Sequence, residues 1–570
     1  MRTMMETDRA EIDRRGETRD EDVPARQAAA GRPAILVADV FAEPGMELLR
    51  AQARVDVRRG LDEDALAAAL IEGHYDALVV RSESRVTARV LGASPSLRVV
   101  ARAGVGIDNI DVPAATRRGV LVLNMPTGNT VTTAEHTMSL LCALVRTLPQ
   151  ANASLRAGRW DRGQFLGMEL LGKTLGIVGL GRVGSEVARR AQGFGMNVVA
   201  YDPYIVPEVA ERLHVTLHPY LDDLLREVDI LTVHTPLNGE TRGIIGAREL
   251  ALLPAGARVV NCARGGIVDE AALLAALESE HVAGAALDVF VGEPIRDPQH
   301  PLISHPRVVA TPHLGSATHE AELKVALGTA RETLLALDGA PVGTAVNVPT
   351  APAGAVEAVT PYLTLARTLG HLAVQWDRGP LTALRVGVSG ELTGLETSPL
   401  VAAALTGVFA GVTDERVNQV NARLVAEERG LRVEEVRSSD ASEEGYRGAL
   451  HLRLQRDEAH AVDLAGVVVH GQGRLLSING YRLDLPLDEG EWLITRHQDR
   501  PGLIGAIGQL MGESGINIGF MQVGRDQPQG MALMVVGVDA PVPDAVLARV
   551  KDLPFVQSAR RLRMGSSSSS

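Results

Sequence analysis

Aromatic residues, cysteine and lysine are all scarce in this sequence of 570 residues. Aromatics make up 3% of the chain, so Ala, Val, Leu and Gly must fill the cores. The two cysteines, Cys142 and Cys262, stand far apart in apolar surroundings, which argues against a disulfide framework or a metal site and fits a reducing compartment. Only Lys173, Lys324 and Lys551 are lysines, so Arg abundance reflects composition and each Arg must be judged by its surroundings.

Long hydrophobic runs and excess positive charge are missing as well. No apolar segment approaches the roughly 18 residues that a membrane-spanning helix needs, and the N-terminus shows no charged-then-apolar signal pattern. The formal net charge of −13 disfavours general binding to nucleic acids or anionic membranes. We therefore expect a cytoplasmic protein without nucleic-acid or membrane partners. The 45% apolar and 22% charged residues are typical of globular proteins, and the length predicts about three to five domains.

Short apolar runs alternate with helical stretches from residue 34 onward. This alternation is typical of buried parallel strands with crossover helices, so we predict two doubly wound α/β units. Between them, residues 130–148 have the pattern of one long helix that bridges two domains, forms a subunit interface, or does both. The runs are AILVA (34–38), DALVV (76–80), LRVVA (97–101) and VLVLN (120–124), then TLGIVGLG (174–181), NVVAYD (197–202), DILTVHTP (229–236), ARVVNCAR (257–264), VAGAALDVF (282–290) and RVVATPH (307–313).

The pattern changes in the last third of the chain. A Gly-, Pro- and Ala-rich stretch at residues 339–361 predicts a domain boundary. Residues 360–488 then mix helix-like and alternating segments without a catalytic constellation. From Glu491 the order strand, helix, strand, strand, helix, strand predicts a ferredoxin-like module. The charge-rich residues 1–33 are expected to form a disordered extension, and the serine tail at residues 565–570 is not expected to pack.

The segment GLGRVG lies directly between a predicted strand and a predicted helix. Its glycines Gly179, Gly181 and Gly184 let the backbone approach a pyrophosphate, and the helix N-terminus supplies N–H donors and a positive dipole. The next strand ends at Asp202, whose carboxylate can accept a hydrogen bond from a ribose 2′-OH and repels a 2′-phosphate. The pattern predicts a dinucleotide site that prefers NAD to NADP.

Three polar residues near strand ends of the second series could act on a hydroxy acid. His313 offers an imidazole, the side chain whose unperturbed pKa of about 6.5 suits a base that takes a hydroxyl proton. A carboxylate such as Glu293 beside that ring would favour its protonated form, and the guanidinium of Arg264 could bind a substrate carboxylate through two hydrogen bonds. Taken singly, each is better explained as a helix-capping His, a solvated Glu or a surface Arg.

Together, the motifs of residues 34–348 resemble the D-isomer-specific 2-hydroxyacid dehydrogenase family. This resemblance implies that Arg264 binds substrate, that His313 is the catalytic acid/base and that Glu293 is its paired carboxylate. The segments that match the family in order and spacing are RAGVGIDNID (102–111), GLGRVG (179–184), VHTPLNGETRGII (233–245), VNCARGGIVDEAAL (260–273), ALDVFVGEP (286–294) and TPHLGSAT (311–318).

The resemblance also implies a set of cofactor contacts. Many relatives carry Thr where this chain has Val105, so a side-chain hydrogen bond to the cofactor is expected to be missing there. Cys262 is expected to be a small apolar wall residue and not a nucleophile. The implied contacts are Val105, Gly179, Gly181, Arg182, Val183, Gly184, Asp202, Thr235, Cys262, Ala263, Arg264, Asp288, His313, Leu314, Gly315 and Ser316.

Arginines in the first α/β unit are candidates for binding the end of the substrate that lies away from its carboxylate. Arg81 and Arg102 end two predicted strands and resemble the phosphate-holding positions of the phosphoglycerate dehydrogenases within this family. Two or three guanidiniums fit the charge and the oxygen geometry of one phosphate. By the same analogy, Arg162 would reach the site from a partner subunit. The expected substrate-binding residues are Arg81, Ser82, Arg102, Gly104 and Arg162.

The C-terminal module resembles an ACT domain, an amino-acid-sensing ferredoxin-like fold, over residues 492–525. The region before it resembles the extra allosteric substrate-binding domain of the long phosphoglycerate dehydrogenases. In that branch serine binds between paired ACT domains, and the matching positions here are His497, Asp499 and Asn517. Ordinary turn chemistry is the alternative, since Asp499 could merely cap the helix after Pro501.

The resemblance gives a full architecture and a function as expectations. The expected reaction is the NAD-dependent oxidation of 3-phospho-D-glycerate to 3-phosphooxypyruvate, the first step of L-serine biosynthesis, by a homodimer or homotetramer that serine inhibits. A hydroxypyruvate or glyoxylate reductase and a non-catalytic NAD-sensing regulator are the alternatives. The implied domains are a substrate-binding domain at 34–129 and 314–348, an NAD-binding Rossmann domain at 130–313, an α+β intervening domain at 349–488 and the ACT domain at 489–564.

Overall fold

The computed structural model describes most of the chain after residue 30. Residues 1–30 of the predicted disordered extension and the serine tail at residues 565–570 lie outside the described residues. Among the helices that the structure describes, none is both long and apolar enough to cross a membrane. The described residues are 31–349, 356–377, 379–410, 412–413, 415–438, 446, 448–457, 460–487 and 490–564.

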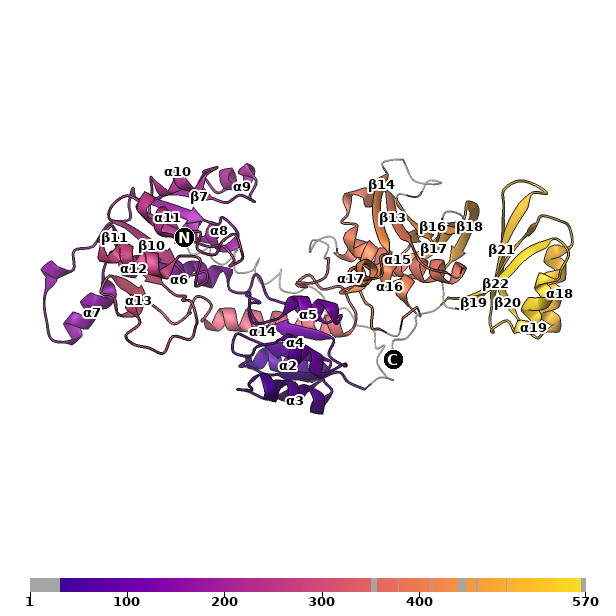
Figure 1. The fold of residues 1–570 in the computed structure, drawn as a ribbon, viewed down its shortest axis with the longest axis horizontal. Coiled ribbons are helices and arrows are strands. Elements are labelled where there is room, and N and C mark those ends of the chain that lie inside the picture. Colours follow the sequence, from indigo (N-terminus) through magenta and orange to yellow (C-terminus); the bar gives the residue numbers. More distant parts are fainter. Residues whose placement is uncertain are drawn as a thin grey trace, which may run out of the picture.

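A five-stranded parallel sheet forms the first unit, with strand order β2-β1-β3-β4-β5 and helices packed against it (Figure 1). Strands β1 and β3 are buried along their whole length, which explains their continuous apolar runs. Strand β2 was not predicted, because this half-exposed edge strand has no such run. The elements are β1 (Ala34–Val37), α2 (Glu43–Gln52), β2 (Arg54–Val57), α3 (Glu63–Gly73), β3 (Ala77–Val80), α4 (Ala88–Ala93), β4 (Val99–Arg102), α5 (Val112–Arg117) and β5 (Leu121–Leu123).

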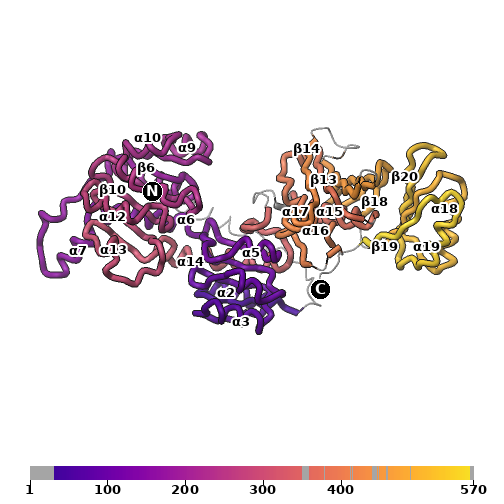
Figure 2. The backbone as a smooth tube through the Cα atoms, viewed as in Figure 1, coloured from indigo at the N-terminus to yellow at the C-terminus, as the bar shows by residue number. Residues whose placement is uncertain are grey.

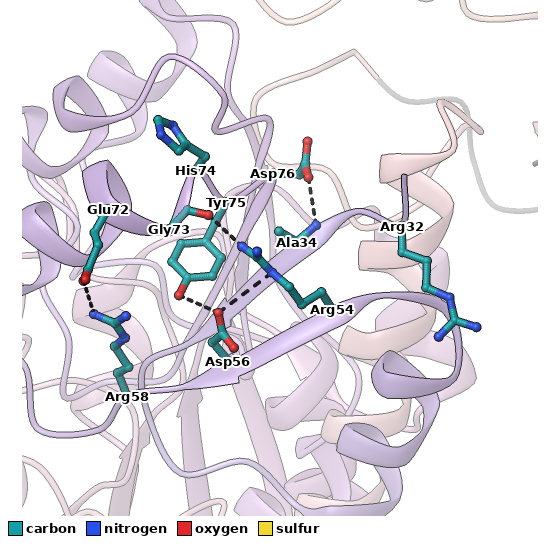
Figure 3. A pocket seen from close by; sticks show the side chains of 10 residues that line it. All are labelled: Arg32, Ala34, Arg54, Asp56, Arg58, Glu72, Gly73, His74, Tyr75 and Asp76. Atoms are coloured by element: carbon teal, nitrogen blue, oxygen red, sulfur yellow. Dashed lines mark hydrogen bonds and ion pairs between the residues drawn. The ribbon is translucent and has the colours of Figure 1, made fainter. Parts of the chain in front are cut away.

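A hollow of about 550 Å³ lies at the amino ends of these strands and is lined by charged side chains (Figure 3). Most of these charges contact one another. The Arg54 guanidinium donates to the carbonyl oxygen of Gly73 at 2.7 Å, and Arg58 donates to the Glu72 carboxylate at 2.8 Å. These bonds tie the edge strand β2 to the end of α3. The charged side chains of the hollow therefore stabilise the edge of the sheet, and none of the predicted site residues lines it.

A seven-stranded parallel sheet forms the second unit, with strand order β12-β11-β10-β9-β6-β7-β8. The prediction of two doubly wound parallel sheets is confirmed, and only the two-residue edge strand β8 was not foreseen. The elements are α6 (Thr130–Val145), α7 (Leu148–Arg156), η1 (Arg162–Gln164), β6 (Thr174–Val178), α8 (Arg182–Gly193), β7 (Asn197–Tyr201), α9 (Pro207–Arg212), β8 (Thr216–Leu217), α10 (Leu221–Leu225), β9 (Ile230–Val233), α11 (Ala247–Leu252), β10 (Ala257–Asn261), α12 (Glu270–Glu278), β11 (Val282–Leu287), α13 (Pro301–Ser304) and β12 (Val308–Ala310).

The predicted single helix over residues 130–148 is wrong, because the structure has two helices there. Helix α6 ends at Val145, and Thr147 adopts a left-handed conformation with φ of 47° before α7 begins. Pro149 causes the break. A proline lacks the N–H that a continuous helix needs and clashes with the preceding turn, whereas it is well tolerated in the first turn of a new helix.

Helix α14 (His319–Leu337) returns the chain to the first unit, where it lies beside α2 (Figure 2). Ala326 and Ala330 of α14 are buried in one cluster with residues of β1 and β4. The chain therefore crosses between the two parallel sheets twice, once before α6 and once before α14. The assignment of residues 314–348 to the same domain as residues 34–129 stays a prediction that this packing favours.

The last third of the chain builds two further sheets. A six-stranded mixed sheet has the order β14-β13-β15-β16-β17-β18, and a four-stranded antiparallel sheet has the order β20-β21-β19-β22. The predicted βαββαβ order is confirmed for the latter. The elements are α15 (Val356–Trp376), β13 (Ala383–Gly390), η2 (Glu391–Gly394), α16 (Ser398–Phe409), α17 (Ala422–Glu428), β14 (Arg432–Ser438), β15 (Gly448–Gln455), β16 (Ala461–Val469), β17 (Gln472–Ile478), β18 (Tyr481–Pro486), β19 (Gly490–Gln498), α18 (Leu503–Glu513), β20 (Ile518–Arg525), β21 (Met531–Val538), α19 (Asp544–Lys551) and β22 (Val556–Met564).

The two C-terminal sheets share one apolar core. Trp492 and Val535, on one face of the four-stranded sheet, belong to the same buried cluster as Leu365 of α15 and Val386 of β13. The other face of the four-stranded sheet packs against α18 and α19. Gln375 of α15 also bonds the backbone N–H and carbonyl of Arg563 on the edge strand β22, at 2.9 and 3.1 Å. The ferredoxin-like module is therefore joined firmly to the mixed sheet.

Helices α15 and α16 approach closely at two glycines. A Cβ at Gly407 would collide with the carbonyl oxygen of Arg367, and a Cβ at Gly370 would collide with that of Ala404. We expect Gly407→Ala to lower the free energy of unfolding by about 1–3 kcal/mol, because the helices must separate to admit the methyl group. The melting temperature, followed by scanning calorimetry, measures this loss.

The control for this substitution is Gly508→Ala in α18, where a Cβ would meet nothing within 4 Å. Its melting temperature should stay or rise, because Ala is the better helix former. Equal melting temperatures for the two variants would contradict the close helix packing.

Candidate active site

The predicted catalytic residues and all the predicted substrate residues except Arg162 gather in one cleft between the two parallel sheets. The cleft has a volume of about 1580 Å³. Its walls are loops at the carboxyl ends of parallel strands, which is where open α/β sheets bind ligands. The predicted residues that line it are Arg81, Ser82, Arg102, Gly104, Val105, Arg264, Glu293, His313 and Ser316.

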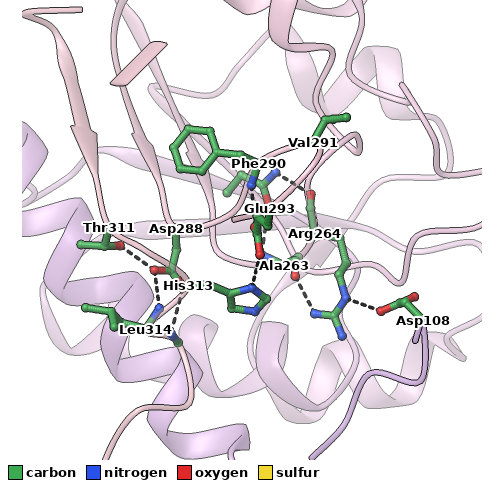
Figure 4. A network of polar contacts seen from close by, with 12 residues as sticks. Asp108, Ala263, Arg264, Asp288, Phe290, Val291, Glu293, Thr311, His313 and Leu314 are labelled. Atoms are coloured by element: carbon green, nitrogen blue, oxygen red, sulfur yellow. Dashed lines mark hydrogen bonds and ion pairs between the residues drawn. The ribbon is translucent and has the colours of Figure 1, made fainter. Parts of the chain in front are cut away.

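His313 and Glu293 face each other in this cleft (Figure 4). The distance from His313 Nδ1 to Glu293 Oε2 is 2.6 Å, and Glu293 Oε1 accepts the backbone N–H of Phe290 at 2.7 Å. Burial acts to raise the pKa of Glu293, but the hydrogen bonds from His313 and Phe290 outweigh it and lower the pKa. An ionised carboxylate can only accept, so Nδ1 carries a proton and Nε2 of the neutral ring is free to take one.

The turn that carries His313 is bonded to Asp288 at the end of β11. The carboxylate of Asp288 accepts the backbone N–H groups of Leu314 at 2.7 Å and Gly315 at 2.8 Å, and the hydroxyl of Thr311 at 2.5 Å. The backbone N–H of His313 donates to the carbonyl oxygen of Asp288 at 2.9 Å. His313 itself is left-handed, with φ of 56°. These bonds hold a backbone conformation that a non-glycine residue seldom adopts.

Asp288 is fully buried, yet its carboxyl group has a lowered pKa. Burial acts to raise the pKa, and the hydrogen bonds from His136, Thr311 and the Leu314 backbone reverse this. His136 comes from α6 and was not among the predicted site residues. It is one of several polar residues in the first half of α6, so the sequence alone does not reveal its tertiary partner.

Arg264 extends across the cleft toward the first unit. Its Nε lies 3.1 Å from Asp108 Oδ2. The side chain of Asn261 fixes the loop, since it donates to the carbonyl oxygen of Arg264 at 2.9 Å and accepts the N–H of Ala263 at 3.0 Å. A Cβ at Gly106 would collide with the Arg264 guanidinium, so only glycine leaves room for it. Asp108 was not predicted, although it lies in the RAGVGIDNID motif.

Arg81 begins a turn that the side chains of Asp39 and Asn109 hold by hydrogen bonds. The buried carboxylate of Asp39 accepts the backbone N–H of Arg81 at 2.5 Å and the hydroxyl of Ser84 at 2.7 Å. The side chain of Asn109 donates to the carbonyl oxygens of the same two residues, at 2.8 and 2.7 Å. The Arg81 guanidinium lies 3.4 Å from Glu322 on α14. Its position is therefore set by groups that are distant in the sequence.

Arg102 is a half-buried cation of the cleft. Burial, together with the positive charges of Arg264 and Arg81, lowers its pKa to about 10. Its Nε has no hydrogen-bond partner among the described residues. A Cβ at Gly104 would collide with its guanidinium, which explains the glycine at that position. Three guanidiniums thus repel one another in a site that an anion would stabilise.

The glycine-rich turn fits a dinucleotide. Gly179 has φ of 94° and no room for a side chain beside Thr235, and a Cβ at Gly184 would collide with the carbonyl oxygen of Gly179. Space is open around Gly181, directly before α8, where N–H groups of the first turn lack helical partners. The Thr235 hydroxyl is buried without a hydrogen-bond partner in the described part of the chain. Arg182 and Val183 form the start of α8.

Asp202 closes the other end of this site. One carboxylate oxygen accepts the N–H of Leu180 in the glycine-rich turn at 2.9 Å, and the other accepts the N–H of Tyr204 at 2.9 Å. The carboxylate is therefore fixed at the tip of β7 beside the turn. Cys262 is buried at the end of β10, and burial raises the pKa of its thiol to about 12, which suits a wall residue and not a nucleophile.

Four predicted site residues lie away from both the cleft and the glycine-rich turn. Arg162 is in η1, on a segment that follows the projecting helix α7 (Figure 1). His497 and Asp499 lie at the end of β19, whereas Asn517 precedes β20. His497 pairs with Ala532 at the start of β21, whereas Ile518, next to Asn517, pairs with Val538 at its end, so a single chain does not bring these three residues together.

Three protein-family profiles match the chain in order. They are the D-isomer specific 2-hydroxyacid dehydrogenase NAD binding domain over residues 138–315, the D-3-phosphoglycerate dehydrogenase intervening domain over residues 358–479, and the ACT domain over residues 492–555. The second and third coincide with the mixed sheet and the four-stranded sheet.

Curated relatives extend over nearly the whole chain. The D-3-phosphoglycerate dehydrogenase of Synechocystis is 41% identical over 531 residues, which cover 93% of this chain and 94% of the relative. The protein of the same name from Mycobacterium tuberculosis is 44% identical and covers 90% of this chain and 96% of its own. Among solved structures, a glyoxylate reductase from Paecilomyes thermophila is 32% identical with a TM-score of 0.52, over 56% of this chain and 99% of its own.

His234 follows β9 directly behind the glycine-rich turn. Its Nε2 lies 3.0 Å from the hydroxyl of Thr232, and its backbone N–H donates to the carbonyl oxygen of Val178 at 2.7 Å. Burial lowers the pKa of the imidazole to about 4. The folded protein therefore keeps this ring neutral where an unfolded chain would protonate it.

We expect the free energy of unfolding to fall on acidification because of His234. The unfolded chain binds this proton near pH 6.5, whereas the folded protein binds it only near pH 4. The contribution is fully present above about pH 6.5 and is lost as the pH falls to about 4. In His234→Asn, which keeps a neutral polar side chain, the loss across this window should be smaller in chemical denaturation. The same pH dependence in both proteins would contradict the assignment.

Proposed function

The chain belongs to the D-3-phosphoglycerate dehydrogenase family, and from this premise we propose that it oxidises 3-phospho-D-glycerate at C2 to 3-phosphooxypyruvate with NAD. This reaction opens L-serine biosynthesis. The observation that carries the proposal is the His313–Glu293 pair, 2.6 Å apart, in a cleft that also holds Arg264, Arg81 and Arg102. Action in the cytoplasm is part of the same proposal, and the free cysteines Cys142 and Cys262 fit it.

His313 is the base of the proposed reaction. Its Nε2 takes the proton of the C2 hydroxyl, and Glu293, bonded to Nδ1, stabilises the resulting imidazolium. Arg264 binds the substrate carboxylate. To do so, its guanidinium must either leave Asp108 or contact Asp108 and the substrate at the same time. NAD, when bound, accepts the hydride from C2. The same residues run the reverse reaction, in which protonated His313 returns its proton to the oxygen.

The cofactor is held at the carboxyl ends of the second sheet. The pyrophosphate fits at Gly181 and the first turn of α8, with Arg182 and Val183. Asp202 accepts from the ribose hydroxyl and disfavours NADP. The orphaned hydroxyl of Thr235 is a further contact. The remaining contacts of the proposed site are Val105, Cys262, Ala263, Arg264, Asp288 and the turn from His313 through Leu314 and Gly315 to Ser316.

Arg81 and Arg102 hold the phosphate in this proposal, with Ser82 and Gly104 beside them. Arg102 is half-buried with a buried, unbonded Nε, and burial together with the two neighbouring cations lowers its pKa. An incoming phosphate would supply the missing acceptor and relieve the repulsion. A hydroxypyruvate or glyoxylate reductase acts on acids without a phosphate and would not need this cation. The arginines therefore favour the phosphorylated substrate.

A homodimer is the assembly that fits the exposed segment after α6. Leu155, Trp160, Leu166 and Leu171 are 55%, 79%, 86% and 74% exposed on this segment, which projects from the second sheet (Figure 1). Such exposed apolar side chains on one projection are typical of a subunit contact. Arg162 lies among them. We propose that a second copy of the chain covers this segment and that Arg162 reaches the partner's cleft.

The ACT module is proposed to bind serine at a second contact between copies. His497 and Asp499 lie opposite the start of β21 at Ala532, whereas Asn517 lies beside its end at Val538, roughly 20 Å away at 3.4 Å per residue. Strand β20 is an edge of its sheet. Antiparallel pairing of two β20 strands about a two-fold axis would place His497 and Asp499 at the same end as Asn517 of the partner subunit.

The chemistry of these residues suits an amino acid. The carboxylate of Asp499 can accept a hydrogen bond from an ammonium group. It already accepts hydrogen bonds from the Arg525 guanidinium at 3.1 Å and from the backbone N–H of Gln529 at 3.2 Å. Burial lowers the pKa of His497, which therefore offers a neutral ring. Asn517 can donate its amide to a carboxylate once it leaves Asp539, its partner at 2.5 Å.

Replacing His313 tests the reaction. His313→Ala should lower kcat by about 10²–10⁴-fold, the usual contribution of a general base, while NADH affinity by fluorescence titration stays within about threefold. Glu293→Gln should cause a smaller loss. The assay is NADH formation from 3-phosphoglycerate at alkaline pH. Wild-type turnover in His313→Ala would refute the proposed mechanism.

Replacing Arg81 tests the substrate. Arg81→Gln should raise the KM for 3-phosphoglycerate by about 10- to 100-fold, as expected for a charged hydrogen bond, and leave the KM for D-glycerate unchanged. The control is Arg89→Gln in α4, since Arg89 pairs with Asp64 outside the cleft. A wild type that prefers D-glycerate would favour the reductase instead.

The serine site predicts feedback inhibition that depends on Asn517. L-serine should suppress NADH formation by the wild type, whereas D-serine should not. In Asn517→Ala the inhibitory concentration should rise at least about tenfold, because one hydrogen bond to the carboxylate is lost. The control is Gln509→Ala, which removes an amide from the outer face of α18. Wild-type activity that ignores serine would remove the effector site and keep the enzyme.

A further inference from the structure

The hydrogen bonds around Asp288 require His136 to act as a donor. Nε2 of His136 lies 3.1 Å from Asp288 Oδ1 and 3.2 Å from the hydroxyl oxygen of Thr311. The Thr311 hydroxyl lies 2.5 Å from the same Oδ1 and has only one proton, which it gives to the carboxylate. Both neighbours of Nε2 can then only accept. Nε2 of His136 must therefore carry a proton and donate it to this pair.

We propose that His136 is a positioning residue for the reaction: it completes the hydrogen bonds of Asp288 and so fixes the turn that presents His313. The inference rests on the proposed function for the role of His313. Asp288 is fully buried, so loss of the His136 donor would leave a carboxylate out of contact with solvent with one hydrogen bond fewer. The His136 side chain is itself 18% exposed.

The location of His136 strengthens this role. It lies two turns into α6, the helix that follows the first crossing between the two parallel sheets, and the His313 turn leads directly into the second crossing. The two crossings touch, since the hydroxyls of Thr132 and Thr318 are 3.4 Å apart. A Cβ at Gly315 would lie 3.5 Å from the Thr133 side chain. The His136–Asp288 contact therefore anchors the catalytic turn at the point where the two units join.

Two substitutions separate the donor from the shape of the side chain. His136→Leu removes the donor, whereas His136→Gln offers an amide N–H at nearly the same reach. Both are compared with His218→Leu, which removes an imidazole that contacts Glu227 at 2.6 Å on the same sheet and far from the cleft. His136→Asn, whose amide is too short, replaces the Leu variant if that protein does not fold.

The first measurement does not depend on activity. Hydrogen exchange of peptides that span residues 308–318 reports the Leu314 and Gly315 amides that donate to Asp288. We expect at least tenfold faster exchange in His136→Leu, and wild-type exchange in His136→Gln and His218→Leu. Unchanged exchange in His136→Leu would overturn the proposal, and so would a Gln variant that exchanges as fast as the Leu variant.

The second measurement is steady-state kinetics. We expect kcat to fall by about 10- to 100-fold in His136→Leu with an unchanged KM for the hydroxy acid, because Arg264, Arg81 and Arg102 lie on other segments while His313 is misplaced. His136→Gln should recover kcat to within about threefold. A raised KM at unchanged kcat would overturn the positioning role. If the wild type does not oxidise 3-phosphoglycerate, the proposed function fails, and the exchange data still decide the inference.

Discussion

The buried carboxylate of Asp288 is the group on which the catalytic arrangement depends. An ionised carboxylate without water costs several kcal/mol unless donors surround it. Here the donors are Thr311, Leu314 and Gly315 on the turn that carries His313, and His136 behind it. The hydrogen bonds that stabilise the Asp288 charge are therefore the same ones that fix the shape of the turn. The left-handed backbone of His313 persists because these bonds determine it, and it directs the ring to Glu293.

A second constraint is the repulsion among cations in the cleft. Arg102 is half-buried, and its neighbours Arg264 and Arg81 make its charge still less favourable. Asp108 and Glu322 offset part of this repulsion from exposed positions. In the proposed reaction, a substrate with a carboxylate at one end and a phosphate at the other would neutralise both groups of cations at once. An acid without the phosphate would leave Arg102 uncompensated, so the repulsion among these cations would select for a substrate that is anionic at both ends.

The sequence predicted the elements whose pattern is local. Both parallel sheets, the glycine-rich turn and the βαββαβ module were predicted because buried strands and turn glycines leave their own signature. Edge strands β2 and β8 lack that signature, and Pro149 divided a helix that its apolar content alone made continuous. The cleft residues were predicted through strand ends and motif resemblance. His136, Asp108 and Asp39 were not, because each acts on a partner that only the tertiary fold brings near.

The C-terminal module also shows what the sequence pattern could not predict. His497, Asp499 and Asn517 were grouped by resemblance, yet one chain holds them at opposite ends of β21. One face of this sheet is covered by the helices and the other by the mixed sheet, and α15 bonds the edge strand β22. In the proposed assembly a second copy pairs with the edge strand β20, whose Gln522 already accepts the backbone N–H of Asp484 on β18 at 3.0 Å. An effector held across that edge would act on the mixed sheet through a shared core, which is stiff because it is closely packed.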